Sequence, residues 1–179
     1  TSTNASTECI ECPAGKYLGD DGITASLHDE AGDCFACPSG HYATSGQASC
    51  TPCIVGKYLS DTGTDITYHD EEADCKICNA GFYADTAGSA ECSACPAGTH
   101  LEYDDSSAYV QFHDEAADCQ VCDAGTYAPS QNASDCIDCP TGRFLEGDDT
   151  NATKHDSEAD CALCDAGTHG PTRGATSKS

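Results

Sequence analysis

Sixteen cysteines in eight Cys-x-x-Cys pairs constrain the fold of this 179-residue chain more than any other feature. Successive pairs are separated alternately by a long gap of 21 or 23 residues and a short gap of 12 or 13 residues. One long and one short half together make a repeat of 41 to 44 residues. A fixed period of this length indicates tandem modules rather than one ordinary domain. The pairs are Cys9/Cys12, Cys34/Cys37, Cys50/Cys53, Cys75/Cys78, Cys92/Cys95, Cys119/Cys122, Cys136/Cys139 and Cys161/Cys164.

The chain lacks the large side chains that a single hydrophobic core requires. It has no Trp and no Met, and only eight Tyr and four Phe. Cysteine makes up about 9% of the residues, which is typical of a disulfide scaffold. We therefore predict a small disulfide-rich fold, an elongated rod of tandem cysteine-rich repeats with short β-ribbons and turns and little regular secondary structure.

The predicted module boundaries follow the cysteine pairs. The first residues resemble the end of a short half, and the last residues resemble its beginning, with Lys178 where a cysteine is expected. We therefore expect both ends of the sequence to fall inside a short half, so that each end holds one part of it. The predicted divisions are an N-terminal arm that completes a half-module (1–8), repeat 1 (9–49), repeat 2 (50–91), repeat 3 (92–135), repeat 4 (136–164) and a C-terminal half-module tail (165–179).

Every half opens with the same motif, in which a glycine follows the second cysteine by three residues and an aromatic ring or histidine follows the glycine by two. Glycine permits a turn with positive φ. We expect the ring to cover the neighbouring disulfide and to give each half a minimal apolar cluster. The motif glycines are Gly15, Gly40, Gly56, Gly81, Gly98, Gly125, Gly142 and Gly167.

The order Cys-x-x-Cys-x-x-Gly-x-Tyr, Asp-Cys-x-x-Cys-x-x-Gly-x-Tyr, Cys-x-x-Cys resembles the cysteine-rich repeats of tumour necrosis factor receptors. It is still more similar to the ephrin-receptor-like cysteine-rich repeats of many extracellular proteins. The resemblance covers residues 9 to about 169. The tumour necrosis factor receptor module carries an extra cysteine pair that this chain lacks. Such modules occur in receptors and in structural proteins, so the resemblance is more specific for fold than for function.

Two disulfide patterns are compatible with eight pairs. In the first, each repeat closes on itself, beginning with Cys9–Cys34 and Cys12–Cys37. The second is implied by the family resemblance, and joins the second cysteine of each pair to the first of the next. Each of its loops contains one glycine motif, which favours this ladder, and Cys9 and Cys164 remain for an intermolecular disulfide. The ladder pairs are Cys12–Cys34, Cys37–Cys50, Cys53–Cys75, Cys78–Cys92, Cys95–Cys119, Cys122–Cys136 and Cys139–Cys161.

Charge and glycosylation motifs indicate a secreted, extracellular chain. Three Asn-x-Ser/Thr sequons, at Asn4, Asn132 and Asn151, accompany the high cysteine content. The net charge of −24 excludes nucleic acid as a partner, because phosphate binding needs Lys and Arg. No apolar run approaches the ~20 residues of a membrane span. Covalent glycans are expected, and no other cofactor apart from weakly bound calcium.

A His-Asp element recurs before the second pair of each repeat, at His28, His69, His113 and His155, with a further aspartate immediately before the cysteine. One interpretation is a metal site or a pH-sensitive joint. The favoured interpretation is structural, because a repeated fold repeats its own supports. Aspartates would then cap the turn that enters Asp-Cys, with the histidine hydrogen-bonding beside it. The four histidines are therefore only weak metal candidates.

Other metal and redox chemistry is less favoured. Calcium could use the acidic turns at 20–22, 104–105 and 148–149, but no EF-hand pattern is present. Zinc fits the spacing of two Cys-x-x-Cys pairs about 20 residues apart, but the sequons and acidity disfavour a cytosolic zinc protein. Eight pairs without a βαβ pattern do not indicate thioredoxin-type chemistry. No phosphate-binding loop, Gly-x-Ser-x-Gly or convincing acid pair is present, so we expect no enzymatic activity.

These observations favour a structural subunit of an extracellular glycosylated fibre, filament or surface appendage. Copies would assemble head to tail into a homopolymer, or the chain would be a piece of a longer repeat protein in which neighbouring repeats complete the half-modules. The alternative is a receptor-like or adhesion ectodomain that binds a protein ligand. Its ligand patch is expected around the cluster Tyr103, Tyr109 and Phe112, which lies outside the repeat motif, as Tyr68 does.

Overall fold

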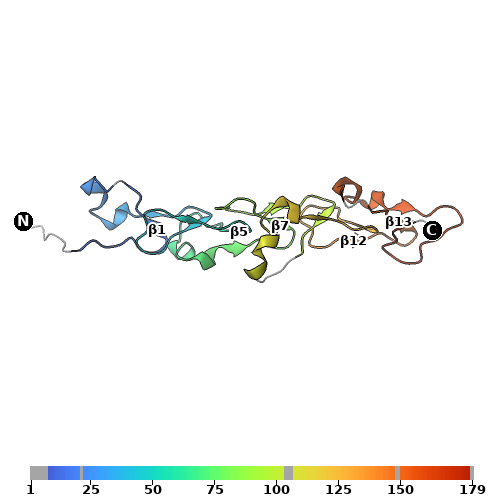
Figure 1. The fold of residues 1–179 in the computed structure, drawn as a ribbon, viewed down its shortest axis with the longest axis horizontal. Coiled ribbons are helices and arrows are strands. Elements are labelled where there is room, and N and C mark those ends of the chain that lie inside the picture. The colour runs from blue at the N-terminus through green and yellow to red at the C-terminus, as the bar shows by residue number, and fades with distance from the viewer. Residues whose placement is uncertain (1–7, 21, 103–106, 148–149, 178–179) are drawn as a thin grey trace, which may run out of the picture. The chain divides into compact units, whose positions relative to one another are not determined.

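The fold consists of two-residue β-strands and short 3-10 helices joined by irregular loops (Figure 1). The structure is a computed structural model that describes residues 8–20, 22–102, 107–147 and 150–177. Within these ranges there is no α-helix, and no helix is long and apolar enough to cross a membrane. The sequence prediction of a small disulfide-rich fold with short ribbons and turns is confirmed.

The chain divides into two units. Unit 1 comprises Thr1–Ile54, Tyr58–Lys76 and Ala87–Glu91, and unit 2 comprises Val55–Lys57, Ile77–Thr86 and Cys92–Ser179. The division falls inside the second predicted repeat, at β5 (Lys57–Tyr58) and β6 (Lys76–Ile77). Each unit is described by itself below.

Unit 1 contains two antiparallel ribbons whose second strand lies between the two cysteines of a pair. In the first ribbon, β1 (Lys16–Tyr17) pairs with β2 (Phe35–Ala36). In the second, β3 (His41–Tyr42) pairs with β4 (Thr51–Pro52). The glycine turn therefore directs each Gly-x-aromatic strand back along the x-x residues of the next Cys-x-x-Cys. The 3-10 helices of the long halves are η1 (Ala25–Leu27), η2 (Ala31–Asp33), η3 (Ile66–Tyr68) and η4 (Glu72–Asp74).

Unit 2 repeats this arrangement with four ribbons. Their strand pairs are β7 (Phe82–Tyr83) with β8 (Ser93–Ala94), β9 (Thr99–His100) with β10 (Gln120–Val121), β11 (Thr126–Tyr127) with β12 (Ile137–Asp138) and β13 (Arg143–Phe144) with β14 (Ala162–Leu163). The 3-10 helices of its long halves are η5 (Ser107–Phe112), η6 (Ala116–Asp118), η7 (Ala152–Lys154) and η8 (Glu158–Asp160).

Seven disulfides connect the cysteines in sequential order, with Cα–Cα distances of 5.6 to 5.9 Å. Cys12 bonds Cys34, and Cys37 bonds Cys50. The alternative disulfide pattern, in which Cys12 bonds Cys37 and each repeat closes on itself, is therefore wrong. Cys9 and Cys164 stay outside the ladder. The bonds are Cys12–Cys34, Cys37–Cys50, Cys53–Cys75, Cys78–Cys92, Cys95–Cys119, Cys122–Cys136 and Cys139–Cys161.

Small apolar clusters around the disulfides replace a common core. In unit 1, Leu59 packs with the Cys53–Cys75 bond, and Tyr42 lies against the same cluster. In unit 2, Tyr127 and Leu145 pack with Cys139 and Cys161. The ring of the short half thus covers the disulfide of the following long half. The leucine after the long-half motif, which the sequence prediction overlooked, supplies the second apolar group.

A prediction follows for the disulfide of the second long half. The double variant Cys53→Ser/Cys75→Ser removes a link across a sequence separation of 22. Chain entropy gives about 3 kcal/mol for a loop of this size. Since repeats contact mainly their neighbours, amide hydrogen exchange should accelerate in η3 and η4 and stay unchanged in β11 and β12. Equal acceleration throughout the chain would contradict this account.

Candidate functional site: the histidine clamps

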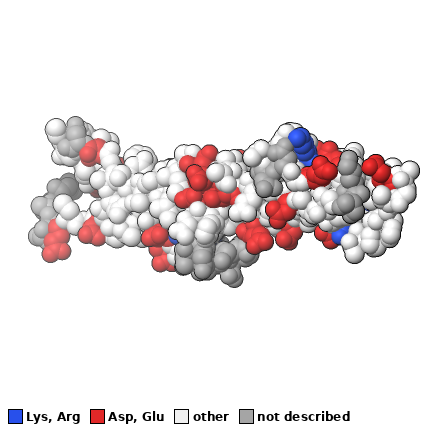
Figure 2. Space-filling view, turned by 45° about the vertical axis from the view of Figure 1, so that its right-hand side comes forward, with Lys and Arg blue, Asp and Glu red and all other residues white. Residues whose placement is uncertain are grey.

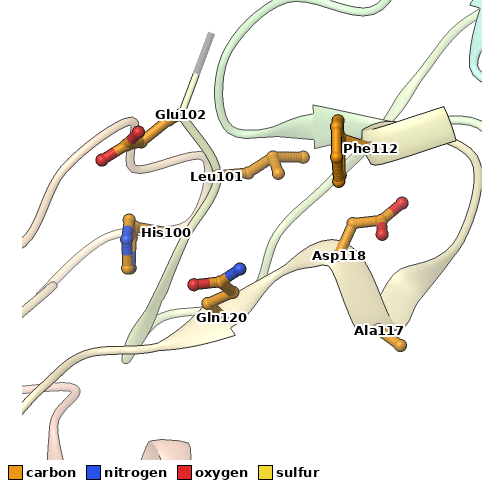
Figure 3. A pocket seen from close by; sticks show the side chains of 7 residues that line it. All are labelled: His100, Leu101, Glu102, Phe112, Ala117, Asp118 and Gln120. Atoms are coloured by element: carbon orange, nitrogen blue, oxygen red, sulfur yellow. The ribbon is translucent and has the colours of Figure 1, made fainter. Parts of the chain in front are cut away.

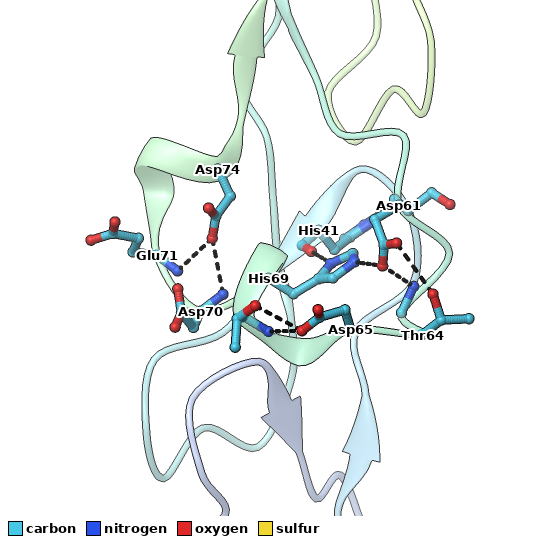
Figure 4. A network of polar contacts seen from close by, with 11 residues as sticks. His41, Asp61, Thr64, Asp65, His69, Asp70, Glu71 and Asp74 are labelled. Atoms are coloured by element: carbon cyan, nitrogen blue, oxygen red, sulfur yellow. Dashed lines mark hydrogen bonds and ion pairs between the residues drawn. The ribbon is translucent and has the colours of Figure 1, made fainter.

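The recurrent histidine holds two backbone groups of the preceding short half. His69 is fully buried, and its Nδ1 donates to the backbone oxygen of His41 at 2.7 Å (Figure 4). The backbone oxygen of His69 accepts from the N–H of Ala43 at 2.9 Å. Together these hydrogen bonds grip both sides of Tyr42. We call this pair of bonds a histidine clamp.

Two further histidine clamps in unit 2 have the same geometry. The Nδ1 of His113 bonds the Phe82 oxygen at 2.8 Å, and the His113 oxygen accepts from Ala84 at 2.8 Å. The Nδ1 of His155 bonds the oxygen of Thr126 at 2.9 Å, and its backbone oxygen accepts from the N–H two residues further on at 2.8 Å. Both histidines are fully buried. Each clamp therefore joins one long half to the short half before it.

The acidic residues after each histidine close a local turn through backbone hydrogen bonds. Asp74 Oδ2 accepts from the backbone N–H groups of Asp70 and Glu71 at 3.1 and 3.2 Å (Figure 4). The Glu71 side chain accepts from the N–H of Asp74 in return, which forms a capping box. The same box recurs at Glu30/Asp33, Glu115/Asp118 and Ser157/Asp160.

Asp61 completes the clamp of the second repeat. Its Oδ2 lies 2.9 Å from the Nε2 of His69 and also accepts from the N–H of Gly63 at 2.8 Å (Figure 4). The hydrogen bond with His69 lowers the pKa of Asp61 below its ordinary value, and the bonds from Gly63, Asp65 and Thr64 act in the same direction. Both ring nitrogens of His69 therefore lie against an acceptor, the carbonyl of His41 on one side and the carboxylate of Asp61 on the other.

His28 has the same local bond but no clamp. Its Nε2 lies 2.7 Å from Asp20 Oδ1, as His69 lies against Asp61. Its side chain is 39% exposed, whereas His69 is fully buried. Among the described residues, no group bonds its Nδ1 or its backbone oxygen. The structure thus separates the four sequence candidates into three buried clamps and one exposed histidine.

Two groups of potential metal ligands lie close together among the described residues, and both have other bonds. The first joins His100 to Cys122 and Cys136, whose sulfurs form a disulfide and are not thiolates. The second is the carboxylates of the η4 turn, where Asp74 already accepts two backbone N–H groups. The candidate calcium residues Asp21, Asp104, Asp105, Asp148 and Asp149 lie outside the described residues.

A pocket of about 560 Å³ lies in unit 2 (Figure 3). Phe112, which is 49% exposed, lines it, and Tyr68 of unit 1 is exposed as well. Tyr103 and the side chain of Tyr109 lie outside the description. The lining residues are His100, Leu101, Glu102, Phe112, Ala117, Asp118 and Gln120.

Two of the three sequons fall on described residues. Asn132 is exposed and has φ of 60°, in a turn of the third short half. Asn151 caps η7, where its Oδ1 accepts from the backbone and hydroxyl of Thr153 at 3.2 and 2.7 Å. A glycan on Nδ2 would leave that oxygen free to keep the cap. Asn4 lies outside the described residues.

Among the charged residues on the visible face, Asp and Glu outnumber Lys and Arg (Figure 2). This distribution agrees with 31 acidic and 7 basic residues in the chain. Close approach of two such surfaces is opposed by like charge at low ionic strength.

The fold and its clamps define a cysteine-rich repeat protein of an extracellular type. The chain matches the tyrosine-protein kinase ephrin type A/B receptor-like family at residues 63–111 and 108–157, which together span more than half of its length. It belongs to this family, and the resemblance stated from the sequence is confirmed. A comparison with curated proteins gave no match.

A matched pair of variants tests the clamp. His113→Ala should lower the free energy of unfolding by about 2–3 kcal/mol, because it leaves a buried carbonyl unpaired and opens a void. His28→Ala should change it by less than about 0.5 kcal/mol, as is usual for exposed positions. Urea unfolding of both variants in a Cys9→Ser background measures the difference. Equal effects would contradict a structural role for the clamp.

The Asp61–His69 bond predicts a pH dependence. The folded-state pKa of Asp61 lies below the unfolded value, so the ionised carboxylate stabilises the fold. This contribution is complete above about pH 3.9 and is lost as the pH falls through the lowered pKa. The melting temperature of Asp61→Asn should therefore lie below that of the unmodified chain at pH 7, and the two should converge in acid. Asp135→Asn, at an exposed site, serves as the control, and a gap independent of pH would refute the assignment.

Proposed function

We propose that the chain is a structural subunit of an extracellular, glycosylated fibre or surface appendage, in which copies join head to tail. The single observation that carries this proposal is the pair of cysteines outside the ladder. Cys9 is exposed and Cys164 is half-buried. In the repeat, Cys9 is equivalent to Cys50 and Cys164 to Cys37, which form a disulfide. A bond from Cys164 of one copy to Cys9 of the next would continue the ladder by one step.

The proposed bond requires an oxidant. Two thiols each lose a proton and one electron to form the S–S bond, and the two electrons pass to dioxygen or to an oxidised dithiol of the secretory route. The oxidising setting in which such repeats form their other disulfides supplies this chemistry. Glycans at Asn132 and Asn151 and the acidic surface would keep the polymer hydrated and oppose lateral aggregation.

The rest of the chain supports a structural role. The three buried histidines and the aspartates beside the cysteines are committed to clamps and capping boxes. Among the rings of the glycine motif, Tyr42 and Tyr127 pack in clusters with disulfide cysteines. Little reactive chemistry remains on the described residues for another task.

Denaturing gels and electron microscopy test the proposal. Without reductant, the protein should run as a series of multiples of 18.4 kDa, and reductant should convert the series to monomer. Filaments should be visible by negative staining. Cys9→Ser and Cys164→Ser should each abolish the series because either change removes one partner of the bond. A purely monomeric protein with two free thiols would overturn the fibre proposal.

The pocket beside Phe112 favours a second candidate, a receptor-like or adhesion module that binds a protein ligand. A partly exposed ring at the edge of a pocket is a common anchor in protein interfaces. Phe112→Ala separates the two candidates, since it should abolish binding of a protein ligand and leave filaments unchanged. Loss of filaments in this variant, with the fold intact, would count against the structural proposal.

A further inference from the structure

His28 is equivalent to the three clamp histidines, but among the described residues its Nδ1 and its backbone oxygen lack the partners that those histidines have. The His28 ring is oriented by Asp20, as His69 is oriented by Asp61. Ala25 at the start of η1 is exposed, although the equivalent residues Ile66 and Ala152 are half-buried. The outer face of the first long half is therefore built like an interface, and within the described residues it packs against no short half.

Residues 167–170 form the complementary half of such a joint. This segment is equivalent to residues 40–43, and its local turn has formed, with the Thr168 N–H donating to Asp165 at 2.9 Å. Gly142 N–H donates to the Gly170 oxygen at 3.0 Å, as the equivalent glycines of the other long halves do. The Thr168 oxygen and the Gly170 N–H, the two groups that a histidine clamp engages, make no hydrogen bond within the described part of the chain.

Three glycines show open space on the first long half and in the last two halves of the chain. Gly22, Gly142 and Gly167 have positive φ, and a Cβ atom built on any of them would meet nothing within 4 Å. At the equivalent glycines inside the array, a Cβ would lie within 3 Å of the backbone of an adjacent repeat. The open spaces thus correspond to contacts that internal repeats receive from their neighbours. The crowded equivalent of Gly22 is Gly63. The crowded equivalents of Gly142 are Gly15, Gly56 and Gly98, and those of Gly167 are Gly40, Gly81 and Gly125.

The first cysteine pair, Cys9/Cys12, encloses two residues that pair with no strand among the described residues. Ile10 and Glu11 lie between Cys9 and Cys12, as β4, β8 and β12 lie between the cysteines of their pairs. Those three strands pair with β3, β7 and β11, the equivalents of residues 168–169. Ile10 is 94% exposed and belongs to no described ribbon.

We infer that the first long half of one copy docks onto residues 167–170 of a second copy and forms a fourth histidine clamp. In this clamp His28 Nδ1 donates to the Thr168 oxygen, and the Gly170 N–H donates to the His28 oxygen. Ile10 and Glu11 add the second strand of a ribbon to residues 168–169. The contact places Cys9 beside Cys164, so the inference rests on the proposed function and specifies its interface.

Two complementary cysteine variants allow this contact to be measured one joint at a time. A chain with Cys9→Ser keeps only Cys164, and a chain with Cys164→Ser keeps only Cys9. When dilute samples are mixed in a glutathione redox buffer, they should form one disulfide-linked heterodimer. The rate of its formation, read from gels without reductant, reports how well the two ends dock.

Substitutions placed on the correct copy should slow this reaction at least ten-fold. These are His28→Ala on the chain that keeps Cys9, and Gly167→Asn on the chain that keeps Cys164. Asparagine is among the residues that adopt positive φ most readily, as Asn132 does at 60°, so Gly167→Asn is the choice that fills the docking space; its strain at φ of 91° is present equally when it is placed on the opposite copy. Each substitution on the opposite copy provides the matched control, because that end takes no part in the measured bond, and should leave the rate unchanged.

The outcomes separate the interface from the function. Slowing only on the correct copy supports the fourth clamp. Heterodimer formation at one rate in all combinations would overturn the clamp and leave the head-to-tail fibre standing. Failure of the two unsubstituted cysteine variants to form a heterodimer would overturn both. Gly167→Asn on the wrong copy also detects any general damage to folding.

Discussion

The sequential disulfide ladder is the constraint on which the rest of this structure depends. Each of the six internal Cys-x-x-Cys pairs bonds backward with its first cysteine and forward with its second, so the two x residues are fixed as a strand. The preceding Gly-x-aromatic segment then pairs with that strand, and its ring covers the next disulfide, as Tyr42 covers Cys53–Cys75. Covalent links of this kind replace the apolar core that a chain without Trp and Met does not build.

The histidine clamps add hydrogen bonds between a long half and the short half before it. Disulfides constrain only segments that are near in sequence, with separations of 13 to 24 residues. The side-chain bonds of the clamps connect residues 28 to 31 positions apart, and each of the three clamps ties a long half to the short half before it. Because every clamp uses backbone acceptors and donors, the same joint recurs whether the strand residue is His41, Phe82 or Thr126.

Part of this organisation was predictable from the sequence. Cysteine spacing and the glycine motif indicated the fold class, but the residues alone left two disulfide patterns open, and the family resemblance favoured the ladder. The clamps were missed because the partners of His69 and His113 lie in a different half of the array. One signal was present: the residue after the motif ring is Leu in each long half, as at Leu59, and Ala in the first three short halves, as at Ala43. The leucine identifies the long half, which packs apolar atoms against a disulfide, and the alanine identifies the short half, which bonds a histidine.

The account can be tested most directly by mass-spectrometric mapping of disulfides in unreduced protein. It predicts peptides that link Cys12 to Cys34 and Cys37 to Cys50, and the same sequential order through Cys139 and Cys161. Peptides that link Cys9 to Cys34 and Cys12 to Cys37 would contradict it. In that case the strands between the cysteines would be fixed by a different set of bonds, and neither the ribbons nor the clamps described above would form.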